Sequence, residues 1–463
     1  MEELERYMKI VHYLMGIPPV RGGGMIKYAT DLMIEQLRRG NDVILLIPGR
    51  VSFEKNAKCK IKKDKLYHGA TVYRIDNALP VSVFNGIKDI SLYTRSCDEA
   101  MVVSFFEEHK PDIFHIHTLM GLNKEWLGVA KSLKIPTVYT THDYFGICPK
   151  GTLFKEEHVC EDSKWNTCEF CCVNAYSKKR LRIEQSKLYY FYRKNKWITG
   201  FVHKTPTIKI FKNMQAPQIA DGKDAKIIEC MHSQEYNNLR QYFEDMFKNI
   251  TYFHFNSSIA RCIYESRLGS LHGEKISISN LSIRDNRKRK RFVKTLNLAY
   301  FGNLSQYKGY FELYKACEML KADGFMDFKL HLYVGKGTVE SEFVECHDPF
   351  KSDEMQKIYD NTDLVIVPSQ WKETFGFIVL EALSFGTPVI VSENVGAKDI
   401  IPDTMKDECI YGITTKDLYK KLKELYCDRK KLQKLNENIL SMEYAWDFHE
   451  HEKQIEDIYK KLI

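Results

Sequence analysis

The sequence contains no run of about 18 to 20 uncharged apolar residues, which is the length that an α-helix needs to cross a bilayer. Its first six residues include three glutamates, whereas the start of a secretory signal peptide is basic. It also lacks a strong excess of one charge, because 69 basic residues oppose 61 acidic ones and leave a formal charge of +8. We therefore expect a cytoplasmic protein, and so mild an excess does not indicate a nucleic-acid partner.

The length of 463 residues and the composition limit the number and kind of domains. A single core usually stops growing at roughly 250 to 300 residues, so we expect two domains. With 44% hydrophobic and 28% charged residues, the chain does not belong to the disordered class. Without a secretory signal, the 13 cysteines are more consistent with thiols, core residues or metal ligands than with disulfides.

Short apolar strands alternate with amphipathic helices through both halves of the chain. The first half begins with a strand, a glycine loop, a helix and a second strand, at residues 8–14, 22–24, 25–39 and 43–47. The second half repeats the theme, with strands at residues 298–302, 329–334, 364–367 and 389–392 and helices at about 309–321 and 377–385. This alternation predicts an α/β fold with two facing Rossmann-like domains, whose ligand lies between the carboxyl ends of the strands.

The same pattern predicts where the domains begin and end. Residues 1–285 form the first domain, which carries a cysteine-rich and basic insertion at about 148–250, and residues 286–445 form the second. The polar run at residues 284–291 is the best candidate for a linker. Residues 178–196 of the insertion are basic and interleaved with aromatics, so they could lie on an anionic membrane surface or form a solvated helix face.

Residues 368–390 connect a buried strand to a helix through a loop. Gly376 lets the backbone come close to a ligand, and the free N–H groups at the start of the helix favour a phosphate there. Glu373 lies before the helix and Glu381 lies inside it, so the two cannot form a tight catalytic pair. A carboxylate accepts two hydrogen bonds from vicinal hydroxyls, which suits a sugar at Glu373 and a ribose at Glu381. On spacing alone, both glutamates could instead be surface charges.

This segment resembles the Glu-x7-Glu signature of retaining glycosyltransferases with the GT-B fold, in glycosyltransferase family 4. The resemblance includes Pro368-Ser369, Phe375-Gly376, Glu381-Ala382 and the exit at residues 386–390. It implies that Glu373 is a catalytic residue that binds the donor sugar, and that Glu381 binds the ribose. The N–H groups between them would hold the donor diphosphate, and they belong to Thr374, Phe375, Gly376 and Phe377.

Residues 300–309 lie between a strand and a helix, where a lysine can neutralise a leaving diphosphate. They resemble the Gly-Arg…Lys-Gly element of the family. The resemblance makes Lys308 a catalytic and donor-binding residue and places Asn303 beside the donor. Because Asn303 stands where an arginine is usual, either Lys308 suffices or another basic residue compensates.

Two elements of the first domain resemble the acceptor side of the family, and a third candidate, His117, lies near the mouth of a strand by alternation. His142 and Asp143 look like its His-Asp element, which implies that His142 is a catalytic residue close to the transferred sugar and that Asp143 lies on the acceptor side. Without the resemblance, a helix-capping Asp143 and a satisfied His142 are the simpler interpretation. Gly23 and Gly24 resemble an acceptor-side glycine loop. His117 would line the acceptor pocket, although such histidines are more often core residues.

The cysteine spacing in the insertion is compatible with a metal. Cys148, Cys160, Cys168 and Cys171 could supply four thiolates to a tetrahedral structural zinc, with Cys168 and Cys171 as the close pair. The other half is not a Cys-x2-Cys, so free thiols remain an alternative.

The resemblance also implies an activity and its partners. The donor would be a UDP- or GDP-sugar, and the acceptor a saccharide, lipid-linked or growing on a surface, so that the enzyme works in polysaccharide or glycolipid synthesis at the inner face of the cell membrane. No cofactor or metal would be required for catalysis. Residues 446–463 would form a last helix that crosses back to the first domain. The alternatives are a catalytically silent nucleotide-sugar binder, a sugar phosphorylase and a synthase with a soluble acceptor.

Overall fold

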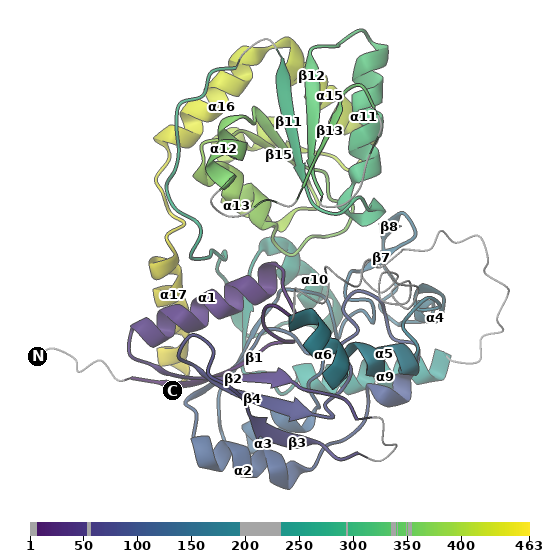
Figure 1. Ribbon diagram of the computed structural model, residues 1–463, viewed down its shortest axis with the longest axis vertical. Helices are drawn as coiled ribbons and strands as arrows, with labels where there is room; N and C mark the ends of the chain where they lie inside the picture. Colours follow the sequence, from purple (N-terminus) through teal and green to yellow (C-terminus); the bar gives the residue numbers. More distant parts are fainter. Residues whose placement is uncertain are drawn as a thin grey trace, which may run out of the picture.

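The computed structural model describes residues 7–52, 57–194, 233–292, 295–334, 339, 341–348, 350 and 354–463. It contains two large sheets, which lie one above the other in Figure 1 and are flanked by helices. Residues 195–232 of the predicted insertion, and with them the end of the predicted basic stretch, lie outside the described residues. Among the helices that are described, none has the length and apolarity needed to span a membrane.

The first sheet has eight strands in the order β10, β9, β6, β5, β1, β2, β4, β3. All neighbours pair in parallel except the edge strand β3, which is antiparallel to β4. The strands are β1 (Lys9–Tyr13), β2 (Asp42–Pro48), β3 (Lys60–Lys63), β4 (Thr71–Asp76), β5 (Ile113–Ile116), β6 (Thr137–Thr140), β9 (Tyr252–Phe255) and β10 (Gly273–Lys275). A separate hairpin joins β7 (Phe154–Lys155) to β8 (His158–Val159).

The second sheet has six parallel strands in the order β13, β12, β11, β14, β15, β16. They are β11 (Leu296–Phe301), β12 (Phe328–Tyr333), β13 (Val344–His347), β14 (Leu364–Val367), β15 (Val389–Ser392) and β16 (Ile410–Tyr411). This is the strand order 3-2-1-4-5-6 of a dinucleotide-binding fold, so the predicted α/β class with two Rossmann-like halves is confirmed. The boundaries at residues 285 and 445 stay predictions.

Helices connect the strands of both sheets. Those of the first half are α1 (Gly24–Arg38), α2 (Glu99–His109), α3 (Glu125–Ser132), α4 (Cys168–Cys171), α5 (Lys178–Glu184), α6 (Lys187–Lys194), α9 (Ser233–Phe247) and α10 (Ser258–Leu268). Those of the second half are α11 (Tyr310–Ala322), α12 (Met355–Asp360), α13 (Phe377–Ser384), α14 (Asp403–Cys409), α15 (Thr415–Cys427), α16 (Arg429–Ser441) and α17 (Phe448–Leu462). Three 3-10 turns, at Ile90–Leu92, Gln306–Lys308 and Gly396–Ile400, complete the described elements.

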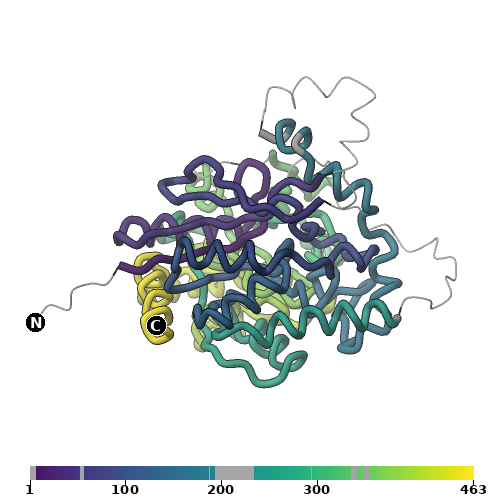
Figure 2. Tube along the Cα trace, turned by 90° about the horizontal axis from the view of Figure 1, so that it is seen from below, coloured from purple at the N-terminus to yellow at the C-terminus, as the bar shows by residue number. Residues whose placement is uncertain are grey.

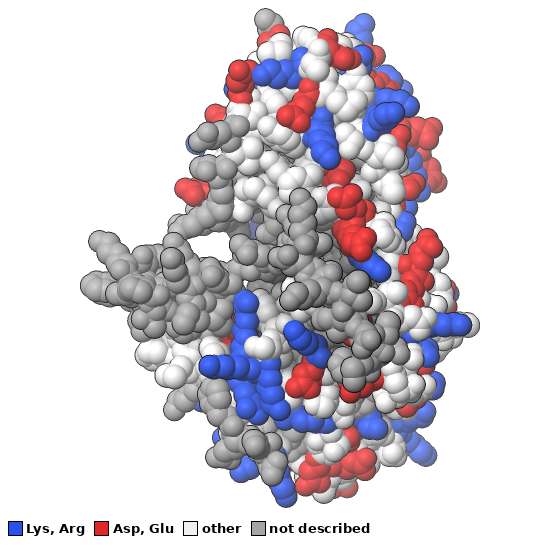
Figure 3. Space-filling view, turned by 90° about the vertical axis from the view of Figure 1, so that its right-hand side faces the viewer, with Lys and Arg blue, Asp and Glu red and all other residues white. Residues whose placement is uncertain are grey.

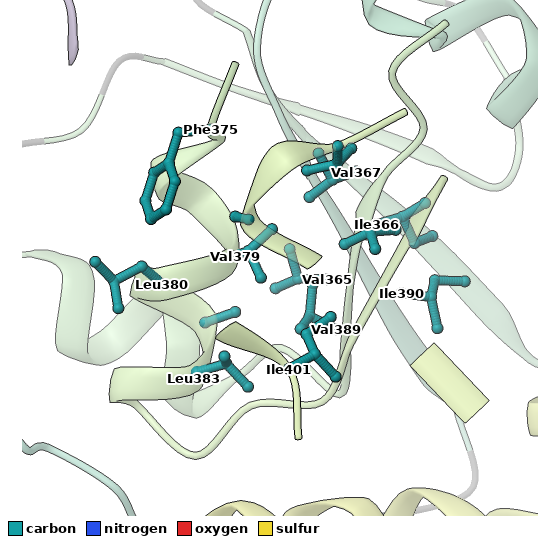
Figure 4. Packing of buried hydrophobic residues seen from close by; sticks show 14 of the residues in the cluster. Val365, Ile366, Val367, Phe375, Val379, Leu380, Leu383, Val389, Ile390 and Ile401 are labelled. Atoms are coloured by element: carbon teal, nitrogen blue, oxygen red, sulfur yellow. The ribbon is translucent and has the colours of Figure 1, made fainter. Parts of the chain in front are cut away.

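The core of the second half fixes helix α13 in place. Strands β14 and β15 are buried along their whole length, as expected for a parallel sheet that is covered on both faces. Val379, Leu380 and Leu383 of α13 pack against their side chains (Figure 4). Since these residues recur at helical spacing, burial of one face sets where the first turn of α13 lies.

The predicted linker is anchored to the second half. Arg287 donates hydrogen bonds to the carbonyl oxygens of Ile439 and Met442, each at 2.7 Å. Lys290 is buried and donates to the carbonyl oxygen of Thr362 at 2.8 Å. The polar run therefore connects the sheets, but its basic residues hold it against α16 and its neighbours.

Helix α17 follows the second sheet in the chain and packs against α1 of the first half (Figures 1 and 2). Its buried residues include Ile455, Ile458 and Tyr459, which form one apolar face at helical spacing. Arg39 forms an ion pair with the fully buried Glu452 at 2.5 Å. The last helix thus ties the second half to the first.

Candidate active site

The predicted site residues lie at the two points where the strand order reverses. In the first sheet this point lies between β1 and β5, and in the second between β11 and β14. Ligands of open α/β sheets bind outside the carboxyl ends of the strands at such points. The loop after β1 leads to Gly23 and Gly24, and the loop after β14 carries Glu373.

Two loops of the second sheet are locked together. The carbonyl oxygen of Tyr307 accepts hydrogen bonds from the backbone N–H groups of Gln370 and Trp371, at 2.9 and 3.2 Å. Gly309 has a φ of +74°, and a Cβ at this position would lie 1.7 Å from the carbonyl oxygen of Pro368. Only glycine fits there, which gives a physical reason for the Lys-Gly pair of the sequence.

Lys308 and Glu373 meet where these two loops contact each other, and we call the two loops together the double loop. Lys308 Nζ lies 2.6 Å from Glu373 Oε1, and Ser369 Oγ donates a hydrogen bond to Glu373 Oε2. The Lys308 ammonium also lies 5.1 Å from the centre of the Trp371 ring. Both oxygens of the carboxylate are thus engaged, and a ligand that approaches Lys308 competes with Glu373 for its charge. The sequence predicted both residues but not their pairing.

The start of α13 faces the start of α1. Gly376 precedes α13 with a φ of +108°, and the first N–H groups of a helix have no acceptor within it. A Cβ on Gly24, at the start of α1, would lie 3.0 Å from the Phe377 ring. Gly23, with a φ of +112°, precedes α1. The glycine loop and the donor segment are therefore neighbours across the two sheets.

Glu381 lies one turn further along α13. Its Oε2 accepts a hydrogen bond from the hydroxyl of the buried Tyr359 at 3.2 Å. Burial raises the pKa of Glu381 to about 7, while Tyr359 and the charge of Lys27 act in the opposite direction. Lys27 is in the first turn of α1, so the first half contributes a positive charge near this carboxyl group.

Aromatic rings extend from Glu381 along the ends of the strands. Tyr359 stacks on Phe385 at 4.6 Å and on Phe301 at 5.4 Å. Phe301 stacks on Tyr333 at 4.8 Å, and Tyr333 stacks on His347 at 4.6 Å. Sequence reasoning missed this ladder, because its five members come from five separate parts of the chain and form no local motif.

His142 contacts both halves. Thr374 Oγ1 donates a hydrogen bond to the carbonyl oxygen of His142 at 2.9 Å, and Ser257 Oγ donates to the carbonyl oxygen of Thr374 at 2.5 Å. These bonds place the His-Asp element of the first half next to the donor segment of the second. Burial, together with the charges of His254 and His451, lowers the pKa of His142 well below its ordinary value, so its ring is neutral.

A chain of buried histidines leads to His142. Gln36 Oε1 lies 2.7 Å from His12 Nε2, His12 Nδ1 lies 3.1 Å from His117 Nε2, and His117 Nδ1 lies 3.2 Å from His142 Nε2. The amide oxygen of Gln36 only accepts, so His12 donates to it and each ring along the chain donates to the one before. This order puts the proton of His142 on Nε2 and leaves a lone pair on Nδ1.

Asp143 holds its own loop together. Its Oδ1 accepts from the backbone N–H of Phe145 at 2.8 Å, and its Oδ2 accepts from Thr118 Oγ1 at 3.0 Å. Burial raises its pKa to about 6. Both oxygens have partners inside the first half, so the acceptor-side role of Asp143 stays a prediction.

Asn303 is exposed, and its carbonyl oxygen accepts a hydrogen bond from the hydroxyl of Tyr300 at 2.6 Å.

Two clusters of side chains near the site carry groups that can bind metals. The ring nitrogens of His12, His115 and His117 lie within 4.8 Å of one another, but hydrogen bonds inside the core engage them. No three of the four predicted cysteine ligands form such a group among the residues that the structure describes. The pKa of Cys168 is raised first by burial and then by the other cysteines, so the thiols are neighbours, and the predicted zinc site stays a prediction.

Comparison with protein families identifies the chain. The family "Glycosyltransferase Family 4" matches residues 22–194, and "Glycosyl transferases group 1" matches residues 282–442. The matches fall on the two sheets and include the Lys308, Glu373 and Glu381 segments. The chain belongs to the family 4 glycosyltransferases.

Curated relatives align with parts of the chain. It is 31% identical over 127 residues to a D-inositol 3-phosphate glycosyltransferase of Corynebacterium diphtheriae, which covers 24% of this chain and 30% of that one. It is 34% identical over 82 residues to the sulfoquinovosyl transferase SQD2 of Arabidopsis thaliana, which covers 17% and 16% of the two chains. These alignments thus span less than a third of each relative.

Solved structures resemble the whole chain. A sucrose-phosphate synthase of Thermosynechococcus elongatus has a TM-score of 0.55 at 12% identity and covers 98% of this chain and 99% of its own. HepE of Anabaena, solved with UDP and glucose, has a TM-score of 0.55 at 14% identity and covers 98% and 100%. WaaG, a glycosyltransferase of lipopolysaccharide biosynthesis, has a TM-score of 0.53 at 12% identity and covers 97% and 99%. They establish the GT-B fold that the sequence predicted.

Proposed function

We propose that this chain is a retaining glycosyltransferase that transfers a sugar from a nucleotide-sugar donor to a saccharide acceptor. One observation carries the proposal: Lys308, Glu373 and the start of α13 converge at the switch point of the second sheet, where Thr374 touches the backbone of His142. A UDP-sugar is the first donor to test, because HepE, which shares the fold, was solved with UDP-glucose. A GDP-sugar is the second.

The donor would occupy the double loop and the first turn of α13. Glu381 would accept hydrogen bonds from the ribose hydroxyls, and the N–H groups of residues 374–377 would bind the diphosphate. Lys308 would exchange part of its contact with Glu373 for a phosphate oxygen. Lys27, whose charge reaches Glu381 from the other half, is the candidate for the positive charge that Asn303 does not supply.

The chemical step breaks the bond between the anomeric carbon and the diphosphate. Negative charge develops on the leaving phosphate, where Lys308 and the helix N–H groups stabilise it. Glu373 and His142 would hold the sugar hydroxyls. The acceptor oxygen would replace the diphosphate on the same face, and its proton would pass to the departing diphosphate oxygen. Since Lys308 and the helix N–H groups supply the positive charge, no metal ion is needed to stabilise the leaving group. We therefore expect turnover to persist in EDTA.

We further propose a lipid-linked or growing saccharide as acceptor, in polysaccharide or glycolipid synthesis at a membrane face. Helix α5 carries Lys178, Lys179, Arg180 and Arg182, and in α6 Leu188 and Phe191 are 80% and 58% exposed. Basic side chains gather in the lower half of the face that Figure 3 shows. A basic surface with exposed apolar residues suits an anionic bilayer.

Release of nucleotide from UDP- and GDP-sugars tests the proposal. We expect Glu381→Ala to abolish donor binding in a thermal-shift assay, and Glu373→Ala to bind the donor but turn over slowly. Glu393→Ala, at an exposed glutamate after β15, is the control and should behave as the wild type. NMR of the product should show the anomeric configuration of the donor. If the protein binds a nucleotide sugar but releases no nucleotide with any acceptor, it is a catalytically silent binder. That result would refute the proposed transferase activity.

A further inference from the structure

Three side chains with metal-binding groups meet on the outer strands of the second sheet, away from the proposed donor loops. His331 belongs to β12, and Glu345 and His347 belong to the edge strand β13. The strands pair in parallel with His331 opposite Glu345 and Tyr333 opposite His347. Because side chains alternate along a strand, residues 331, 345 and 347 all point to one face. The register therefore brings them together.

The ligand atoms of these residues are close. His331 Nδ1 lies 2.9 Å from His347 Nε2 and 3.1 Å from Glu345 Oε2, and one atom from each residue lies within 4.8 Å of the others. In a tetrahedral zinc site with bonds of about 2.1 Å, the ligand atoms are about 3.4 Å apart. The separations of 2.9 and 3.1 Å are a few tenths of an ångström shorter than this, and the third pair of atoms lies within 4.8 Å.

A neighbouring residue fixes the proton of His331. Asn297 Oδ1 lies 3.2 Å from His331 Nε2, while Asn297 Nδ2 donates to Asp363 Oδ2 at 3.1 Å. The second bond turns the amide oxygen toward the histidine, and an amide oxygen only accepts. Neutral His331 thus carries its proton on Nε2 and directs the lone pair of Nδ1 at the Glu345 carboxylate. The same lone pair faces His347 Nε2 at 2.9 Å, so either a proton on that nitrogen or a cation bound by all three groups can occupy the space between them.

We propose that His331 Nδ1, Glu345 Oε2 and His347 Nε2 bind one divalent transition-metal ion, with Zn²⁺ the best match. Two imidazole nitrogens and one carboxylate oxygen are a ligand set that zinc favours, and the Asn297 contact is the kind of outer hydrogen bond that orients such a histidine. The Glu345 side chain is 59% exposed, so the fourth position opens to water.

The ion would act on the structure of the sheet edge. It would link β13 to β12. From His347, stacked ring contacts run through Tyr333 and Phe301 to Tyr359, whose hydroxyl donates a hydrogen bond to Glu381. The site uses none of the groups assigned to sugar transfer. Its occupancy can therefore be measured whether or not the chain proves to be a transferase.

Titration of the EDTA-treated full chain with Co²⁺ tests the site. We expect one equivalent to give the visible d–d bands of tetrahedral Co²⁺ without the intense near-ultraviolet band of thiolate ligands, which separates this site from the cysteines. Zn²⁺ should displace the Co²⁺ and bleach the bands. The proposal is refuted if the wild type shows no d–d bands, or only bands accompanied by thiolate charge transfer.

Variants assign the ligands. His331→Ala and His347→Ala should abolish the bands, and Asn297→Ala should weaken binding by about 10- to 100-fold, as outer hydrogen bonds to ligands do. His272→Ala, at an exposed histidine of the other half, is the matched control and should bind as the wild type. Glu345→Gln changes an exposed position that cannot disrupt the core, and unchanged affinity in this variant would overturn the assignment even if the histidine variants fail to fold.

Discussion

At the scale of single residues, burial sets the protonation of the groups that surround the proposed donor. Glu381 has a pKa of about 7 because its carboxyl group is removed from water. His142 stays neutral for the same reason. Glu381 therefore changes its protonation state near neutral pH, whereas the ring of His142 stays neutral there.

The raised pKa of Glu381 predicts pH-dependent donor binding. The protonated acid predominates below pH 7 and accepts fewer hydrogen bonds from a ribose, so affinity for a UDP-sugar should rise by about 10-fold from pH 6 to pH 8. Calorimetry with a nucleotide sugar measures this, since both of its phosphates are esterified and do not titrate there, unlike the terminal phosphate of UDP. Glu381→Gln should bind weakly and without this pH dependence. An equally steep profile in that variant would contradict the assignment.

The histidine chain predicts a positioning role for His12. His12→Phe removes the acceptor of His117 and releases the tautomer of His142, so kcat should fall on the order of 10- to 100-fold while the KM for the donor changes little. His115→Phe is the matched control: it lies in the same buried cluster but bonds Thr140 and Tyr459 instead of this chain. It should lose stability and keep most of its kcat. Equal losses of kcat in both variants would show that His12 contributes only to packing and does not position His142.

At the scale of elements, two loops and one short helix make the donor side. The loops carrying Lys308 and Glu373 follow neighbouring strands, β11 and β14, and their backbones are joined at Tyr307 and Gly309. Helix α13 is held by its apolar face on β14 and β15. The charged groups are thus placed by backbone packing rather than by their own contacts.

The close contact between these two loops predicts that position 309 does not tolerate a side chain. Gly309→Ala would put a methyl group 1.7 Å from the Pro368 carbonyl oxygen at a φ of +74°, which should destabilise the protein by about 3 kcal/mol and impair donor binding. Gly128→Ala, in the middle of α3 with open space around its Cβ, should instead be neutral or stabilise by up to about 1 kcal/mol. Urea denaturation of both variants compares them. Similar stability of the two would show that the loops separate readily.

At the scale of the whole molecule, α17 joins the halves that the donor must bring together. Tyr28 and Gln36 of α1 bond His451 and Tyr459 of α17, so the helix reaches the same core as the histidine chain. Movement of the second half against the first would therefore pass through α17 and the chain at residues 276–292.

The Arg39–Glu452 ion pair predicts how the contact between α1 and α17 responds to pH. Glu452 has a pKa raised to about 7 by burial, so the folded state resists its ionisation while the unfolded state ionises near 4.5. Stability therefore falls as pH rises from about 4.5 through 7. Arg39→Ala removes the compensating charge and should cost about 3 kcal/mol at pH 8 and much less at pH 5. Thermal melts at both pH values measure it. Arg38→Ala, at a more exposed neighbour, should show no such pH dependence.

Local patterns predicted the strands, the switch-point loops and the glutamate segment well. The strands predicted at 364–367 and 389–392 occur there, because a parallel strand buried on both faces is a continuous apolar run. Lys308, Glu373 and Glu381 were predicted as donor-side residues because each belongs to a short local motif. The Lys308–Glu373 bond, the approach of Lys27 to Glu381 and the histidine chain were not predicted, since their members come from distant parts of the sequence.

The sequence alone determined the fold class, the family resemblance and the segment that would grip a donor, because strand periodicity and motif spacing are local properties. Only the tertiary structure decided which charges meet, which carboxyl groups titrate near neutrality and which histidines share protons. Those properties depend on burial and on contacts between distant strands. The same holds for His331, Glu345 and His347, which only the pairing of β12 with β13 brings within reach of one ion.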